Sequence, residues 1–510
     1  MNQLKLGAIL NYIIILLNTF VGLLYTPYML RMMGQSEYGL YSLAASIISY
    51  LTILDLGFGN AVIRYTAKFR AENKFEEQYE MFGMFFILYL IIGTVTCFLG
   101  MGLYFNVDKI FGATMSIYEL ERVKIMMALL VFNLAFTFPM SIFASIITAY
   151  ERFVFPRIVN IVRILLNTIV MVCLLKFGYK AIAMVIVQTI FNILTLLLNC
   201  VYCFRNLRIH IYFRKFKLPL LREVAIYSFW IFLNVIMDKV YWSTGQFVLG
   251  ATVGAVAVAV FAVAIQLQNM YMQFSTAISS VFLPKVTGLV VANNDNQSIS
   301  DLFIRTGRIQ YIILSFVLSG FIVFGRPFIS LWAGPAYNDA YIITLLFFIS
   351  LLIPLIQNLG VTILQARNQM RFRSILYVII AIVALIFQII FAKIWGGLGC
   401  SIAVASALFI GQGVIMNIYY YRNQHIDIIT FWKEIFKMSV IPAIIVCLGL
   451  LIFNRILIQS WSDLLLYICV FSIIYIPLFY RFSMNSYERE MLVNPIKRLV
   501  AKFKYDKDNR

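Results

Sequence analysis

Long apolar runs separated by short polar segments recur along the whole chain. A helix needs about 20 residues to cross the roughly 30 Å apolar core of a bilayer. On that length, the pattern predicts an all-α polytopic membrane protein with about fourteen transmembrane helices. Their predicted limits are 7–30, 38–62, 81–105, 123–148, 159–178, 181–204, 224–250, 255–281, 309–330, 341–364, 374–392, 398–421, 438–454 and 463–480.

Composition agrees with this reading. Hydrophobic residues make up 62% of the 510 positions and charged residues 12%, with a mean hydropathy of +0.89. An average soluble domain carries about 25% charged residues. The seven cysteines show no framework spacing, so we expect no structural disulfides. Cys200 and Cys203 lie in an apolar helical run, which favours core packing over a zinc site.

Basic residues set the predicted orientation. With the N-terminus inside, the cytoplasmic segments hold thirty lysines and arginines and the outer connections hold nine. This positive-inside bias predicts cytoplasmic N- and C-termini. The net charge of +19 is then explained by anchors beside anionic lipid, and it requires no nucleic acid partner.

Several classes of function are disfavoured by what the loops contain. The longest connections are under about twenty residues, so no soluble domain is inserted, and no GxxxxGK phosphate-binding loop is present. The only histidines, His210 and His425, fall in predicted cytoplasmic loops. We therefore predict no catalytic residues, no metal site and no cofactor, and a transporter that draws on gradients or downstream consumption.

The most informative interior residues are the adjacent charges Asp238 and Lys239 in the span 224–250. A charge at the centre of a membrane helix costs about 2.5 to 3.5 kcal/mol, so such a pair is expected to face a polar cavity or a partner. Polar and aromatic residues surround it in the sequence, namely Asn234, Tyr241, Trp242 and Gln246. In the next span, Gln266 and Asn269 share one helical face.

Other spans carry further interior polar groups. Asp55 lies in the second span with Arg64 at its rim, Arg163 lies in the fifth span beside Asn160 and Asn167, and Gln188 and Asn192 lie in the sixth. Each has a plainer reading, because Arg163 could snorkel to the cytoplasmic boundary and lone amides often join helices by hydrogen bonds. Breaks or kinks are predicted at Pro27, Gly57 with Gly59, Pro139, Pro354 and Pro477.

A weak internal repeat suggests the domain organisation. The segment 33–41 is echoed by 249–257, each a glycine-containing turn between two long helices. A period of six spans predicts two six-helix lobes around a central cavity. The predicted domains are 1–222, 223–437, and 438–510 with two extra helices and a basic cytoplasmic tail.

The segment 29–68 resembles the N-terminal signature of the polysaccharide-transporter family, the Wzx-like flippases of O-antigen and capsule repeat units. The matching residues are Gly34, Tyr38-Gly39-Leu40-Tyr41, Asp55-Leu56-Gly57 and Arg64-Tyr65, and 149–153 (AYERF) is similar to a short inner loop of that family. The resemblance implies the fold of the multidrug/oligosaccharidyl-lipid/polysaccharide exporters and a lipid-linked oligosaccharide as substrate. That family shares a cationic central cavity, whereas this chain has only Arg163 and Lys239 inside its spans, with Arg64 at the rim.

The resemblance thus implies a flippase that moves undecaprenyl-pyrophosphate-linked repeat units to the outer leaflet by alternating access. A polysaccharide polymerase is the candidate protein partner, besides the lipid bilayer and the substrate. Two same-fold alternatives are a drug/cation antiporter and a lipid II flippase. A membrane glycan polymerase or ligase is a fourth reading, for which Asp108, Glu119 and Glu121 are the only clustered acidic candidates in an outer loop.

Overall fold

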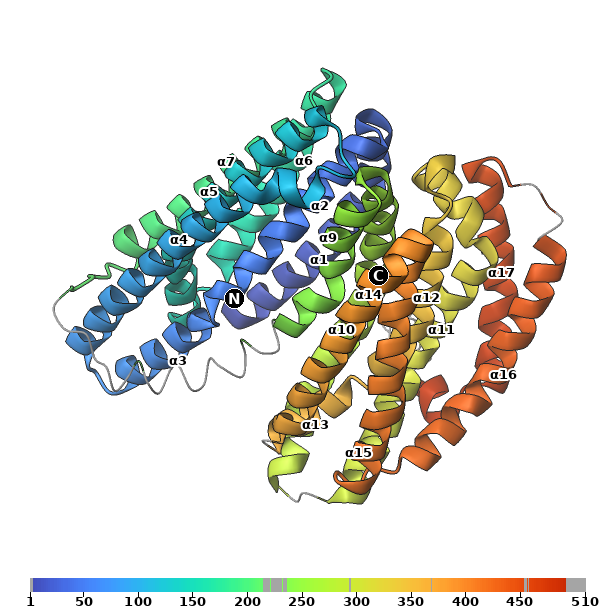
Figure 1. Ribbon diagram of the computed structural model, residues 1–510. Helices are drawn as coiled ribbons and strands as arrows, with labels where there is room; N and C mark the ends of the chain where they lie inside the picture. Colours follow the sequence, from blue (N-terminus) through green and yellow to red (C-terminus); the bar gives the residue numbers. More distant parts are fainter. Residues whose placement is uncertain are drawn as a thin grey trace, which may run out of the picture. The chain divides into compact units, whose positions relative to one another are not determined.

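A computed structural model describes residues 3–213, 221, 232, 236–292, 295–367, 369–453, 456 and 458–491. All regular secondary structure in these ranges is helical, which confirms the all-α prediction (Figure 1). The helices up to the middle of the chain are α1 Gln3–Met33, α2 Gln35–Leu51, α3 Phe58–Ala71, α4 Phe75–Phe111, α5 Ile117–Ala149, α6 Val154–Lys176, α7 Ala181–Arg205, α9 Thr244–Thr252 and α10 Ala255–Ala292. Those that follow are α11 Asn296–Trp332, α12 Ala340–Ile356, α13 Leu359–Ala366, α14 Met370–Leu408, α15 Met416–Arg422, α16 Ile428–Phe453 and α17 Trp461–Phe482.

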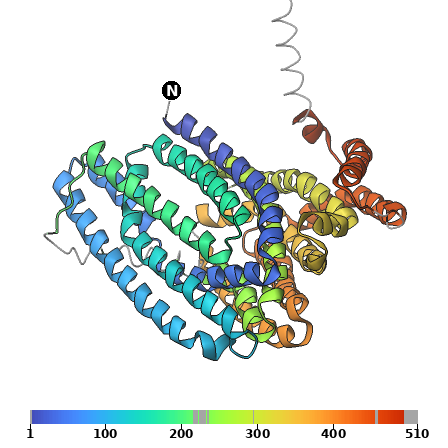
Figure 2. The same ribbon diagram turned by 90° about the horizontal axis from the view of Figure 1, so that it is seen from above.

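The chain folds into two compact units. The first comprises residues 1–265 and 374–404, and the second comprises 266–373 and 405–510. In the first unit α5 is the central helix, since it packs against α2, α3, α4 and α7. Figure 2 shows the blue to green helices of this unit lying side by side. The two six-helix lobes and the C-terminal pair stay predictions.

Eleven helices in the described residues are long and apolar enough to cross a membrane, or twelve if the bent pair α12 and α13 is one span. One of the eleven, Met370–Arg422, has 53 residues. It reverses direction at Gly396, whose φ of 56° and ψ of −133° are not helical. Cys400 Sγ lies 3.9 Å from the carbonyl oxygen of Gln388, although twelve residues of straight helix would span about 18 Å. The predicted spans 374–392 and 398–421 are therefore the two arms of a hairpin.

The predicted break at Gly57 is confirmed. After α2, a 3₁₀ turn covers Thr52–Asp55, and Leu56 and Gly57 adopt left-handed conformations with φ of 51° and 71°. The helix α12 ends two residues after Pro354, and α13 continues at an angle of 41°. By contrast, α1, α5 and α17 run on through Pro27, Pro139 and Pro477. A proline therefore ends a helix here only in α12.

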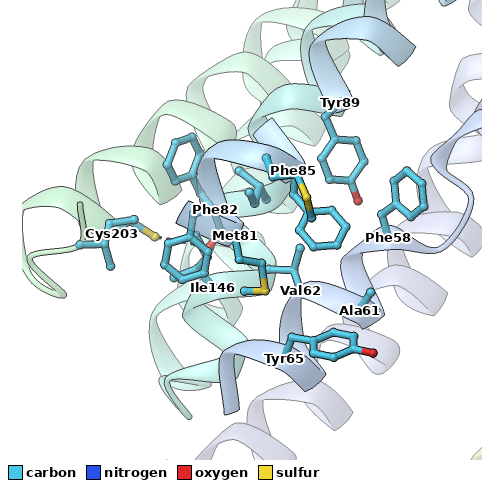
Figure 3. Close-up of a cluster of buried hydrophobic side chains, with 14 of the residues drawn as sticks. Phe58, Ala61, Val62, Tyr65, Met81, Phe82, Phe85, Tyr89, Ile146 and Cys203 are labelled. Carbon is cyan, nitrogen blue, oxygen red and sulfur yellow. Dashed lines mark hydrogen bonds between the residues drawn. The ribbon is translucent and has the colours of Figure 1, made fainter. Parts of the chain in front are cut away.

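A cluster of buried apolar side chains joins α3, α4 and α5 in the first unit (Figure 3). Phe58, which begins α3 directly after the break, packs edge to face on Phe85 and Tyr89, with ring centroids 5.8 and 6.0 Å apart. Such aromatic pairs add about 0.5 to 1.5 kcal/mol beyond the area they bury. The cluster thus fixes the backbone break that carries Asp55.

The two echoing glycine turns adopt related backbone conformations. Gly34 precedes α2 with a φ of 81°, and Gly254 precedes α10 with a φ of 117°. These values favour glycine, which lacks the Cβ that would be strained there. The turns also lie together, because a Cβ on Gly39 would stand only 1.9 Å from the carbonyl oxygen of Ala255. The start of α2 is therefore packed directly against the start of α10.

Candidate functional site

Helical residues 236–242 carry the predicted charged pair into α9. Lys239 is half-buried and Asp238 is exposed, whereas Asn234 lies outside the described residues. Two contacts hold this region on α2: Ser49 donates a hydrogen bond of 2.8 Å to Ser243, and the hydroxyls of Tyr50 and Thr244 are hydrogen-bonded. Lys239 is thus fixed at the backbone, with its side chain partly open.

The neighbouring predicted residues differ in accessibility. Tyr241 is 3% exposed and packs edge to face on Tyr377 at 5.8 Å, so its ring belongs to the packed interior of the first unit. Trp242 and Gln246 are half-buried. These two side chains are therefore the better placed to contact a ligand.

Sequence reasoning missed Gln388, which lies on the first arm of the α14 hairpin. It is 0% exposed, and among the described residues neither its amide nitrogen nor its amide oxygen has a hydrogen-bond partner. Its oxygen lies 3.4 Å from the position that a Cβ on Gly245 would take. In the sequence, Gln388 could have been noticed as an amide in an otherwise apolar run. Its position beside α9 is visible only in the folded structure.

Asp55 is the last residue of the 3₁₀ turn and is half-buried. Its carboxylate interacts with the hydroxyl of Tyr89, which is itself directed toward Ser141. That hydroxyl is buried and makes a hydrogen bond of good geometry with neither group. Arg64, on α3, is exposed, with its guanidinium 5.8 Å from the ring of Tyr65.

Arg163 is half-buried on α6, a helix that packs against α1 and α7. Its Nη2 donates a hydrogen bond of 2.9 Å to Asn160 Oδ1. In the described part of the chain it has no ion pair with a carboxylate, and the Oδ1 of Asn167 on the same helix is buried without a partner. Arg163 therefore keeps guanidinium hydrogens for a further acceptor.

A line of polar side chains crosses α2, α5 and α7, which pack on one another. Asn192 Nδ2 donates to Asn133 Oδ1 at 2.7 Å and to Thr137 Oγ1 at 2.8 Å. The hydroxyl of Tyr41 donates to Gln188 Oε1 at 3.1 Å. We call these five residues the amide seam. The sequence singled out Gln188 and Asn192 as interior groups, but not their partners on α2 and α5.

Gln266 and Asn269 belong to the second unit, on α10, where Gln266 is half-buried and Asn269 is exposed. A buried polar network lies deeper in the same unit. Gln357, just after α12, donates to Asn417 Oδ1 at 2.7 Å, and Trp432 Nε1 donates to the same oxygen at 2.9 Å. Asn417 in turn donates to the carbonyl of Gln412 inside the π-helical turn Phe409–Ile415. This network closes on itself and joins the bent span to α15 and α16.

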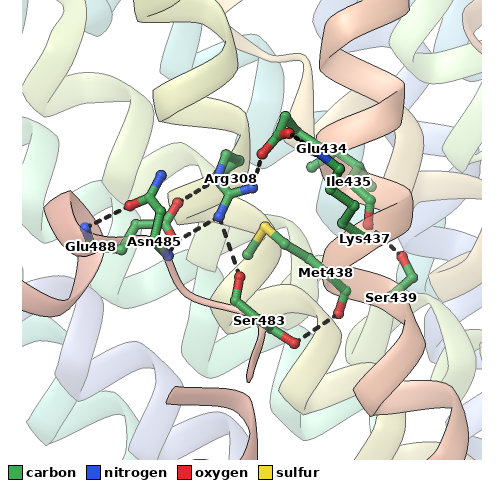
Figure 4. Close-up of polar contacts among 9 residues, drawn as sticks. All are labelled: Arg308, Glu434, Ile435, Lys437, Met438, Ser439, Ser483, Asn485 and Glu488. Carbon is green, nitrogen blue, oxygen red and sulfur yellow. Dashed lines mark hydrogen bonds and ion pairs between the residues drawn. The ribbon is translucent and has the colours of Figure 1, made fainter. Parts of the chain in front are cut away.

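A second missed cluster ties the C-terminal helices together (Figure 4). Arg308 on α11 is 4% exposed and bonds Glu488 through Nε at 2.5 Å and Glu434 on α16 through Nη1 at 2.6 Å. Its Nη2 also donates to the carbonyl of Ser483, after α17, at 3.2 Å. A buried guanidinium needs such saturation to offset its desolvation. These residues stabilise the fold and leave no place for a ligand.

An apolar pocket of about 220 Å³ lies between α10, α11, α12 and α17 of the second unit. Leu267, Tyr271, Phe321, Phe348 and Ile468 are among its lining residues. Apart from the tyrosine hydroxyl, these side chains offer only hydrocarbon and aromatic surface. The pocket suits a hydrocarbon chain rather than a charged group.

The structure therefore brings Asp238, Lys239, Trp242 and Gln246 together on one segment of the first unit. Asp55 with Arg64 and Arg163 lie on other helices of that unit, and no hydrogen bond or ion pair between described residues joins Asp55, Arg163 and Lys239 to one another. These sites share one property: each places polar or charged side chains within long apolar helices. In a bilayer such groups mark pathways for polar substrates.

Residues 4–289 match the family described as polysaccharide biosynthesis protein, and the chain belongs to this family. The predicted resemblance to the polysaccharide transporters is thereby confirmed. No curated protein sequence is significantly similar to the chain.

Solved transporter structures share the fold. A lipid II flippase MurJ in an inward closed conformation is 17% identical, with a TM-score of 0.71 over 94% of this chain and 99% of that one. An inward-facing multidrug resistance MATE family transporter of the MOP superfamily is 14% identical, with a TM-score of 0.58 over 79% and 99% of the two chains. A MOP superfamily transporter from Pyrococcus furiosus is 13% identical, with a TM-score of 0.53 over 81% and 92%. The chain therefore has the fold of these transporter structures, and in the part that the structure describes it holds eleven or twelve helices long and apolar enough to cross a membrane.

Proposed function

We propose that this protein is a flippase for lipid-linked oligosaccharides, which moves undecaprenyl-pyrophosphate-linked polysaccharide repeat units from the cytoplasmic to the outer leaflet. The observation that carries the proposal is Arg163, a half-buried cation on a membrane helix whose one hydrogen bond goes to an amide. The costly part of the substrate to bring across a bilayer is its pyrophosphate. A guanidinium fork matches phosphate oxygens and offsets their desolvation.

Each predicted site residue has a role in this proposal. Lys239 and Arg163 engage the phosphates, and Asp238 or Asp55 either pairs with them in the empty state or couples an ion. Amides bond sugar hydroxyls, and the candidate groups are Asn234, Gln246, Gln266 and Asn269. Trp242 stacks on a sugar face, and the buried ring of Tyr241, 6.2 Å from it, holds it in place, with Arg64 at the cytoplasmic rim. The prenyl tail stays in hydrocarbon, for which the apolar pocket of the second unit offers a matching surface.

The transport step follows from the predicted lobes. Two six-helix lobes that rock about a central cavity would expose the site alternately to the cytoplasm and to the outside. The positive-inside bias supports cytoplasmic termini in a bacterial cytoplasmic membrane. A polysaccharide polymerase that consumes the delivered units is the proposed partner.

Deletion of the gene, followed by analysis of lipid-linked intermediates, tests the proposal. Complete repeat units trapped on the cytoplasmic leaflet are the expected result. Single unpolymerised units accumulating on the outer leaflet would instead identify a polymerase and contradict a flippase.

Lipid II is the second candidate substrate, because the MurJ structure covers 94% of the chain with a TM-score of 0.71. That likeness concerns the fold, so the substrate needs a separate test. Rescue of a strain that lacks its own lipid II flippase would favour this candidate. Binding of cationic dyes by the purified protein would favour a drug antiporter.

A further inference from the structure

The amide seam has hydrogen-bonding capacity that the described protein does not use. Asn192 donates its amide hydrogens to Asn133 and Thr137, and the side-chain oxygen of Gln188 accepts a hydrogen bond from Tyr41. Within the described chain, no further hydrogen bond reaches the Nδ2 of Asn133, the Oδ1 of Asn192 or the Nε2 of Gln188. The seam therefore offers both unused donors and an unused acceptor.

These groups lie deep in the membrane helices and are not sealed by packing. Asn133 is midway along the 33 residues of α5, and Asn192 is near the middle of the 25 residues of α7. Asn133 and Asn192 are half-buried, and Gln188 is exposed. Lipid chains cannot satisfy an amide, and leaving one unpaired in an apolar medium costs about 1 to 3 kcal/mol. A polar molecule is therefore expected to form hydrogen bonds with these unused donors and this acceptor.

The chemistry of the seam distinguishes sugar from phosphate. Its members are neutral carboxamides and hydroxyls, which can donate to and accept from neighbouring sugar hydroxyls. The seam holds no lysine or arginine, so a pyrophosphate would gain no charge there. Part of the seam is plain interhelical bonding, as the Asn192 to Asn133 contact shows, but the unused donors and acceptor are not explained by it.

We propose that the amide seam of Tyr41, Asn133, Thr137, Gln188 and Asn192 binds the glycan of the transported lipid and sets which sugars are accepted. This inference rests on the proposed flippase function and adds the glycan contact to it. The amide seam binds sugar hydroxyls, whereas Lys239 and Arg163 bind the phosphates that all such lipids share.

Binding of two probe lipids by the full chain in nanodiscs tests the proposal. The probes are a polyprenyl pyrophosphate that carries one N-acetylhexosamine and the same lipid without sugar. We expect wild-type protein to bind the sugar-bearing lipid more tightly. Asn192→Leu should weaken that binding by about two- to tenfold, the range for one or two lost hydrogen bonds, and leave the sugar-free lipid unchanged.

The matched control is Thr195→Val on the same helix, because the Thr195 hydroxyl bonds the carbonyl of Phe191 within α7. It should change neither affinity. Asn133→Gln, which retains an amide, should restore part of the preference that Asn133→Leu loses. The sugar-free lipid also serves as the folding control for every variant.

Three outcomes would overturn the proposal. Asn192→Leu that binds both lipids as the wild type does, or that loses affinity for both equally, would make the seam a packing feature. Wild-type protein that binds the two lipids equally would remove glycan recognition while leaving the flippase intact. Wild-type protein that binds neither lipid would overturn the proposed function and, with it, this inference.

Discussion

Two arginines within long helices, Arg308 and Arg163, are treated in opposite ways by the fold. Arg308 is 4% exposed and bonds two carboxylates and a backbone carbonyl. Arg163 is half-buried and donates to one neutral amide oxygen on its own helix. The first guanidinium is saturated by protein groups from two segments far from it in the sequence, whereas the second makes no such contacts with the described residues.

The difference separates a structural cation from one that is available to a ligand. A buried ion cluster contributes little net stability over an apolar replacement, but removal of one partner leaves an uncompensated charge. A half-buried arginine with spare donors is free to meet an anion at little further cost. Charged residues that are buried and paired, as Arg308 is, should affect folding. Charged residues that are partly open and unpaired among the described residues, as Arg163 is, should affect transport.

The largest expected effect is on the buried cluster. Arg308→Leu should destabilise the protein by about 3 to 5 kcal/mol, because Glu488 and Glu434 lose their shared counter-charge. Thermal unfolding of the purified protein in detergent measures this loss. Arg305→Leu is the control, since Arg305 is exposed on the same helix. A fully stable Arg308→Leu protein would break the comparison.

The next effect concerns Lys239, whose substitution should act on transport alone. Lys239→Ala should lower export about thirtyfold or more, because the transported phosphate would lose its charged partner at a cost of about 2 to 5 kcal/mol. Lipid-linked repeat units on the cytoplasmic leaflet measure the loss, and unfolding should be unchanged. Lys393→Ala, at an exposed position, is the control. A variant that exports at the normal rate would remove Lys239 from the proposed site.

A smaller loss is expected for Arg163. Arg163→Gln should reduce export by about tenfold, which corresponds to one charge-assisted hydrogen bond of about 1.5 kcal/mol. Stability should hold, because no described carboxylate depends on this guanidinium. Lys176→Gln, an exposed cation at the end of the same helix, should have no effect. If Arg163→Gln instead unfolds the protein, Arg163 has a structural role like that of Arg308, and the comparison fails.

The smallest effect is at Asp427, just before α16. Hydrogen bonds from the hydroxyl and the backbone amide of Thr430 hold the pKa of Asp427 below its ordinary value. Its stabilising charge is therefore present above about pH 4 and is lost as the pH falls further. Asp427→Asn should cost only about 0.2 to 0.5 kcal/mol near neutral pH, because asparagine also caps helices and solvent screens the charge. Unfolding free energies at pH 7 and pH 3 check this, and the difference between variant and wild type should shrink at the lower pH.

Much of the fold was predictable because apolar run length reports directly on membrane crossing. The pattern predicted the helices and the break at Gly57, but it placed helix starts too late where amphipathic turns precede the apolar run. For example, the span predicted at 309–330 is part of α11, which begins at Asn296. Prolines were weaker guides, since Pro139 lies inside an unbroken helix.

The candidate site was predictable only in its residue types. Charges and amides inside apolar runs stand out in a sequence, so Lys239, Arg163 and Gln188 were found. The residues that pack beside the predicted ones were not, because Asn133 meets Asn192 across 59 positions and Gln388 lies beside Gly245 only in the folded chain. Arg308 lies just before the predicted span 309–330, and the sequence does not reveal that Glu488 lies beside it.

The anchoring of the segment after α17 also affects how motion in this protein can be followed. Because Arg308 holds both Ser483 and Glu488, a spectroscopic label on the exposed Ser486 would report on the parts of α11 and α16 that contact this segment. Such a label would not merely record local wobble of a chain end. Its signal would therefore show when these helices move during the proposed transport cycle.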